Sequence, residues 1–147
     1  MLGPFPLAPV IARLKALVPA LRFIGNAADL RTALDQQPAA VPAAYVVRQE
    51  RAKPSAGASG GVLIQEMGVD VIVVLYVRNL ATASTGEAAA AEMDVLVNQV
   101  RTALLNWRAD AGVDPLSQNA SRDEGYKAGL LIAQELYRSR YRIEVRP

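Results

Sequence analysis

Apolar residues recur at helical spacing in three stretches of the chain, each with its own start or stop signals. Pro19 follows the first stretch and cannot continue a helix. Asn26 precedes the second as an N-cap, and Pro38 closes it. Ser84 and Glu87 have capping-box spacing and open the third and longest. The apolar positions of the predicted helices are Leu7, Val10, Ile11, Leu14, Leu17 and Leu21; Leu30, Ala33 and Leu34; and Met93, Leu96, Val97, Val100, Leu104 and Trp107.

Between these helices the pattern changes to the period of two that is typical of β-strands. The strongest strand covers residues 68–79, where both faces are apolar at the centre, so we expect it to be central and covered on both sides. The other predictions are strands at 22–25, 43–51 and 116–122, a strand resuming near residue 62, a turn at 123–125 and a closing strand at 127–145.

The order of these elements is α, β, α, β-hairpin, α, β-hairpin. It predicts an α+β fold, with a mixed or antiparallel sheet of about four to six strands and two to three helices packed on it. A chain of 147 residues is the size of one domain, and we assign 1–147 to a single one. Residues 53–61 (KPSAGASGG) predict a flexible hairpin loop.

The closing strand has one apolar and one cationic face. Leu131, Ala133, Tyr137, Tyr141, Ile143 and Val145 alternate with the cations, which are Arg138, Arg140, Arg142 and Arg146. A slip of one residue would bury four cations, so the alternation specifies the register. Three interpretations stay open for this arginine face: a solvated outer face, a surface for ion pairs between subunits, or a basic surface that faces phosphate. We name Arg78 and these four arginines as candidate residues of a subunit interface or a lumen.

The predicted sheet carries more apolar surface than its helices can cover. Helices packed on one face alone would leave the other face exposed, which is either the face of Ile72, Val74 and Tyr76 or the face opposite to it. Exposed apolar surface of this extent is typical of protein interfaces. We therefore expect a partner subunit to cover it.

Composition narrows the chemistry that the chain can perform. The sequence has no histidine and no cysteine, which excludes Ser-His-Asp and Cys-His catalysis, disulfides, zinc clusters and His-based metal sites. The net charge of +2 permits contact with nucleic acid without predicting it. No apolar run approaches the ~20 residues of a membrane span, and the first residues do not resemble a signal peptide. We expect a soluble cytosolic protein with no membrane contact.

Two other sequence features have ordinary structural explanations. The GASGG stretch at 57–61 lacks the lysine and hydroxyl residue of a phosphate loop. Glu66 and Asp70, or Asp123 with Glu124, could act as a catalytic pair only if burial separated their pKa values, and both pairs fit exposed positions. We therefore predict no enzyme activity, and no catalytic, cofactor-binding or metal-binding residues.

The chain resembles the tail terminator, or tail completion, proteins of long-tailed bacteriophages and prophages. The resemblance extends over nearly the whole chain. It rests on LKALVPALRFIGNAADLRTAL at 14–34, PAAYVV at 42–47, VDVIVVLYVRN at 69–79, MDVLVNQVRTALLNW at 93–107, DPL at 114–116 and YRSRYRIEV at 137–145.

This resemblance implies a structural virion protein that assembles in the host cytoplasm and closes into a ring, typically a homohexamer. The ring would cap the tail tube at the head–tail junction, stop tube polymerisation and offer a surface for joining the head. Its partners would be other copies of itself, the tail tube protein and a neck or head-completion protein, with genomic DNA passing through the lumen. No cofactor is implied.

Two alternatives remain at this point. One is another virion component, such as a neck, head-closure or minor tail protein. The other is a small oligomeric ligand-binding module or enzyme with its site at subunit interfaces, where Arg78, Arg101 or Asp70 could converge on a pocket.

Overall fold

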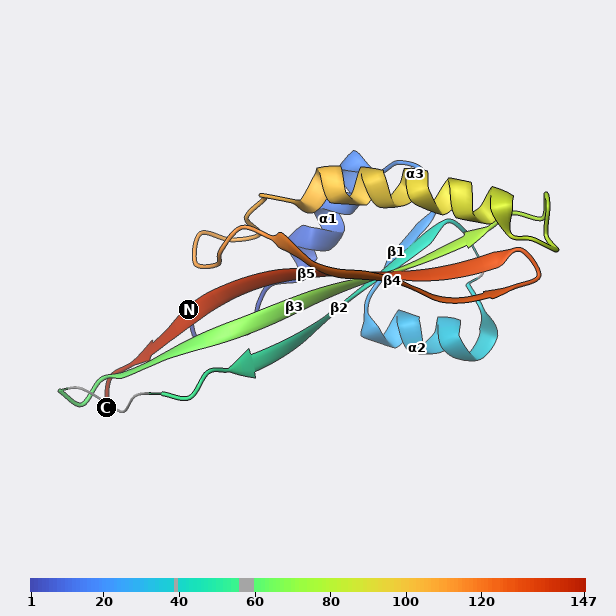
Figure 1. Ribbon diagram of the computed structural model, residues 1–147. Coiled ribbons are helices and arrows are strands. Elements are labelled where there is room, and N and C mark those ends of the chain that lie inside the picture. Colours follow the sequence, from blue (N-terminus) through green and yellow to red (C-terminus); the bar gives the residue numbers. More distant parts are fainter. Residues whose placement is uncertain (39, 56–59) are drawn as a thin grey trace.

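The computed structural model describes residues 1–38, 40–55 and 60–147. It contains a five-stranded mixed sheet in the order β1-β2-β3-β5-β4, with three helices (Figure 1). β1 pairs with β2 in parallel, and the other neighbours are antiparallel. The predicted α+β class is therefore confirmed. In chain order the elements are α1 (Ala8–Leu17), β1 (Phe23–Gly25), α2 (Ala27–Gln36), β2 (Ala43–Ala52), β3 (Leu63–Arg78), α3 (Glu87–Leu104), β4 (Ser117–Lys127) and β5 (Leu130–Val145).

Helices cover both faces of the sheet. α1 and α3 lie on one face, which we call the core face, and α2 lies on the other (Figure 1). The alternate valines of β3 point to the core face and are buried with Leu14 and Leu96 of the two helices. The main core thus forms where the apolar helix stripes meet one side of the predicted central strand.

The expectation of an uncovered apolar face on β3 is wrong. Val74 and Tyr76 point away from the core face, yet they are buried against Ala33 of α2 and Tyr45 of β2. Ile72, one step further along β3, is half-buried. α2 connects the parallel strands β1 and β2 and covers this surface within the same chain.

The start signals of the helices were predicted with mixed success. Asn26 caps α2 as expected: its side chain accepts from the backbone of Asp29, whose carboxylate accepts from the Asn26 backbone. The capping box predicted at Ser84 and Glu87 is wrong. Gly86 is the N-cap of α3 and gives no side-chain cap, and the Thr82 hydroxyl accepts from the Ala88 N–H at 3.0 Å.

In the last hairpin, β4 is longer than predicted, β5 begins three residues later, and the turn lies elsewhere. Residues 123–125 do not form a turn but lie within β4, where a bulge shifts the register between Asp123 and Gly125. The chain reverses at Ala128 and Gly129, both of which have positive φ. At the other hairpin, Lys53 still pairs with Glu66 through its backbone N–H. Residues 56–59 of the predicted 53–61 loop lie outside the described residues, so its flexibility stays a prediction.

β3 and β5 continue well beyond the helices. Their paired ends form an arm, Leu63–Gly68 with Arg140–Val145, that projects from the body of the molecule (Figure 1). The end of β2 still pairs with Met67 and Gly68, so only the outer part of the arm is two-stranded. The N-terminal segment is attached near its base, where Arg48 donates to the Phe5 carbonyl and Glu50 accepts from the Phe5 N–H. The fold therefore places one end of the sheet in the open, on both of its faces.

Candidate functional site

The arginine face of β5 lies on the side of the sheet opposite to the core face. Arg138, Arg140 and Arg142 occupy alternate positions of β5 and stand opposite Asp70, Gly68 and Glu66 of β3. α2 packs at the far end of this side, against Tyr45 and Tyr76, and leaves the arginines exposed. The predicted alternation of the closing strand is thus confirmed for this half of β5.

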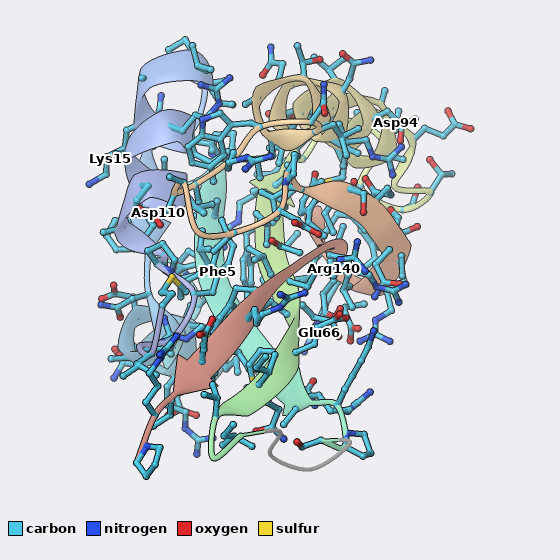
Figure 2. All side chains as sticks on the ribbon, turned by 90° about the vertical axis from the view of Figure 1, so that its left-hand side faces the viewer. Phe5, Lys15, Glu66, Asp94, Asp110 and Arg140 are labelled. Carbon is cyan, nitrogen blue, oxygen red and sulfur yellow. The ribbon has the colours of Figure 1, made fainter. Side chains whose placement is uncertain are left out.

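Arg140 is held by two carboxylates. Its Nε lies 2.5 Å from Asp114 Oδ2, and its Nη1 lies 3.8 Å from Glu66 Oε1. The hydrogen bond to Asp114 raises the pKa of Arg140. Glu66 also accepts from the Lys53 ammonium, and this hydrogen bond is the main reason that the pKa of Glu66 is lowered. Figure 2 shows Arg140 and Glu66 side by side on the open end of the sheet.

Arg138 joins a second polar chain on the same surface. Its guanidinium donates to Asn119 Oδ1 at 2.8 Å, and the Asn119 amide donates to Asp70 Oδ1 at 3.0 Å. Asp70 and Glu66 therefore do not form a carboxylate pair, since one binds an amide and the other binds two cations. This arrangement fixes side chains across β3, β4 and β5 and lacks the features of a general acid–base site.

These residues line a shallow hollow of about 560 Å³. Four cationic side chains (Arg51, Lys53, Arg138 and Arg140) and three carboxylates (Glu66, Asp70 and Asp114) face it. Because the charges nearly cancel, the hollow is not a concentrated anion site. The remaining arginines differ in their contacts: Arg146 lies 3.6 Å from Glu144, while Arg142 forms no ion pair with any described residue.

The other residues named as candidates are not brought together. Arg78 lies at the opposite end of β3, beside Leu130, and donates to Gln37 at 3.0 Å. Arg101 reaches the core face from α3, whereas Asp70 points to the other face. Within one chain, Arg78, Arg101 and Asp70 therefore do not converge on a pocket.

Sequence reasoning missed one residue, Glu135, which is fully buried on the core face of β5. Arg101 binds its carboxylate through two hydrogen bonds, Nε to Oε1 at 2.5 Å and Nη2 to Oε2 at 3.2 Å. The hydrogen bond to Glu135 raises the pKa of Arg101. A signal was available, because Glu135 occupies an apolar position in the alternation of the closing strand.

Above this ion pair lies a groove between α3 and the β4–β5 hairpin, with a volume of about 600 Å³. We call it the α3–β4 groove. Its lining residues are apolar Met93, Val97, Leu105 and Ala133, polar Asn98, Thr102 and Ser121, cationic Arg101, and acidic Asp94 and Asp123. Figure 2 shows Asp94 on α3, apart from Arg140 and Glu66. The groove and the arginine face thus belong to different parts of the molecule.

Among the described residues, no group of three or more Asp, Glu, His or Cys side chains could hold a metal ion. Within the same residues, no helix has the length and apolar character needed to cross a bilayer. The polar clusters that do exist are ion pairs and hydrogen-bonded chains within the fold.

The comparison with known families decides the identity of the chain. The family model described as "Phage tail terminator protein" matches residues 1–147, which is the whole sequence. The chain belongs to the phage tail terminator family. The resemblance inferred from the sequence is confirmed, and the family is one of structural proteins of the phage tail. No curated protein matches the chain.

Proposed function

We propose that this protein closes into a homohexameric ring that caps the end of the tail tube. The ring stops tube polymerisation and provides the surface on which the head is joined. The observation that carries the proposal is the match of the entire chain to the tail terminator family. A role that depends on assembly also agrees with the absence of histidine and cysteine, which removes the commonest catalytic groups.

The shape of the subunit supports an assembling protein. The tip of the arm exposes Leu63, Ile64 and Val145, which a protein that acts alone would have reason to bury. A ring needs two different complementary surfaces on each subunit, because its contacts are heterologous. The arm and the opposite side of the molecule, with α3 and β4, are two such surfaces.

In this proposal one side of the ring binds the last ring of tail tube protein, and the other binds a neck or head-completion protein. The assembly takes place in the host cytoplasm, and the ring ends at the head–tail junction of the virion. Genomic DNA passes through its lumen. Arg138, Arg140, Arg142 and Arg146 serve at a subunit interface or at the lumen. Their partial neutralisation by Glu66, Asp114 and Glu144 suits a surface that must not retain DNA.

The proposal is tested by negative-stain electron microscopy of the purified protein, alone and mixed with the tail tube protein of the same phage. The expected result is rings of uniform diameter, or caps on tube ends that limit tube length. Compact particles that ignore tubes would contradict the proposal. Binding to portal or adaptor protein in place of the tube would instead identify a neck or head-closure component.

A further inference from the structure

The tip of the arm carries exposed apolar side chains. Leu63 stands opposite Val145 on the core face of the sheet, where no helix reaches, and these side chains are 37% and 39% exposed. Ile64, on the other face, is 47% exposed. Leu63 and Val145 thus form an apolar pair in contact with water at the end of the projecting arm.

Behind this tip the arm is cationic. Arg142 is exposed and forms no ion pair among the described residues, although Glu66 stands opposite it in the sheet. Glu66 is already engaged by Lys53 and Arg140, so it does not neutralise Arg142. The arm therefore presents apolar Leu63 and Val145 on one face and an available positive charge, Arg142, on the other.

The α3–β4 groove has the complementary character. Val97 and Leu105 give it accessible apolar lining on the α3 side, above the buried side chains of Met93 and Ala133. Asp94 and Asp123 stand on its two sides, one on α3 and one on β4, and neither forms an ion pair with a described residue. The one cation of the groove, Arg101, is already bound by Glu135. The groove therefore offers apolar surface between two unpaired negative charges.

The arm cannot reach the groove of its own chain. Ser121 of the groove stands opposite Glu135, and Val145 lies ten positions further along β5. At about 3.3 Å per residue these points are roughly 33 Å apart. Any arm that enters this groove comes from another molecule.

We propose that the arm of one copy docks into the α3–β4 groove of the next copy, head to tail. The tip residues Leu63 and Val145 contact the apolar lining from one face of the arm, and Arg142, on its opposite face, pairs with Asp94 or Asp123. Such a contact uses two different surfaces of each subunit, so it joins successive copies and forms a ring when the rotation between them closes. This inference rests on the proposed function and assigns the surfaces by which the ring is joined.

The exposed edge of β4 is the main competing surface for a second copy. Its eleven residues are exposed, and an open edge can pair with another strand. However, β4 carries two register shifts and the charged residues Arg122, Asp123, Glu124 and Lys127. Bulges and charges are the features with which natural edge strands avoid such pairing. The arm and the groove are therefore the better-matched pair of surfaces.

The native chain has no cysteine, so two introduced thiols can report the contact. We would prepare Val145→Cys, Ser121→Cys and the double variant, and treat each with a short bismaleimide. The double variant should give a ladder of covalent oligomers on denaturing gels. Each single variant can give at most a dimer, and a mixture of the two should give the 145–121 heterodimer. Val145→Cys combined with Gln36→Cys, on exposed α2, is the matched control and should give no ladder.

The outcomes separate this proposal from the proposed function. Rings seen by electron microscopy without the 145–121 cross-link would overturn the docking of arm and groove and leave the ring function intact. A ladder from the Gln36→Cys control would equally overturn it, because the joining surface would then lie elsewhere. Neither rings nor cross-links, with tail tube protein present, would contradict both proposals.

Two pairs of variants test the chemistry of the contact. Leu63→Asp should abolish ring formation, whereas Leu34→Asp, at an even more exposed leucine on α2, should leave it unchanged. Arg142→Glu should weaken association about fivefold, and adding Asp123→Arg should restore it if the two charges meet. Sedimentation velocity measures both. Equal effects of the two leucine variants, or no rescue by Asp123→Arg and by Asp94→Arg, would count against the docking.

Discussion

The carboxylate of Glu135 has no exposed surface and accepts two hydrogen bonds from Arg101, whose side chain is 39% exposed at the α3–β4 groove. The pair connects the middle of β5 to the last turns of α3. It therefore fixes how the longest helix lies on the sheet, and with it the shape of the groove.

Removing one partner of this pair should destabilise the fold. Arg101→Leu leaves a buried carboxylate without its cation, and we expect a loss of roughly 2–4 kcal/mol, less than for a fully buried pair because water reaches Arg101. The double variant Arg101→Leu, Glu135→Met should be more stable than Arg101→Leu alone. Urea unfolding followed by circular dichroism measures this. A double variant less stable than both single variants would contradict the explanation.

Stability should fall at alkaline pH as tyrosines ionise. Burial, together with the hydrogen bond that Tyr141 donates to Glu50 at 2.9 Å, raises the pKa of Tyr141 to about 12. A phenol has a pKa near 10 when unfolded, so its contribution is complete below about pH 10 and is lost as the pH rises to about 12. The loss should be roughly 2 kcal/mol for this residue.

The control for this pH dependence is Tyr141→Phe. It should lower the free energy of unfolding at pH 7 by about 1–2 kcal/mol through the lost hydrogen bond, and it should show a shallower alkaline decline. Tyr137, whose pKa burial also raises, remains in both proteins and titrates equally. Parallel stability curves for the two proteins between pH 9 and 12, measured by urea unfolding, would show that Tyr141 is not responsible.

The start of α3 should depend on Thr82 and not on Ser84. The Thr82 hydroxyl accepts from the Ala88 N–H, so Thr82→Val should cost about 1 kcal/mol of stability. Ser84→Ala should change it by less than about 0.5 kcal/mol. Chemical denaturation of both variants decides between the observed start and the capping box that the sequence indicates.

The β4–β5 turn requires glycine at one position. Gly129 has φ +86°, and a Cβ there would lie 2.8 Å from the Asn79 carbonyl oxygen. Gly129→Ala should therefore cost about 2 kcal/mol. Gly125→Ala is the matched control: nothing lies within 4 Å of its Cβ position, and the change should be within about 0.5 kcal/mol. Thermal unfolding of the two variants is the measurement, and equal losses would refute the assigned turn.

Local sequence signals predicted the elements well where a single mechanism governs them. Asn26 and Asp29 form the hydrogen bonds of the capping box at the start of α2 by themselves, so the start of this helix could be recognised without any tertiary contact. The turn predicted at residues 123–125 was wrong because a local signal was overridden by strand pairing. Asp-Glu-Gly has turn chemistry, but pairing with β5 kept the segment in the ladder and absorbed the extra residues as bulges.

The candidate site shows the same division between what local patterns predict and what tertiary contacts decide. The alternation of β5 placed Arg138, Arg140 and Arg142 on one face correctly, because a strand's period of two depends on the backbone alone. Arg140 binds Asp114 in the loop after α3, and Arg138 binds Asn119 of β4. No periodicity relates those two partners to β5. The groove was missed because its two walls are at least 16 positions apart in the chain, from Leu105 to Ser121.

The sequence by itself determined the class of fold, the order of its elements, the charged face of β5 and membership of the tail terminator family. These follow from local periodicity and from the pattern of the whole chain. The tertiary structure alone decided which side of the sheet α2 covers, that Arg101 neutralises Glu135, and how far the arm projects beyond the helices. Such features depend on which distant segments share the same space, and residue spacing along the chain does not specify that.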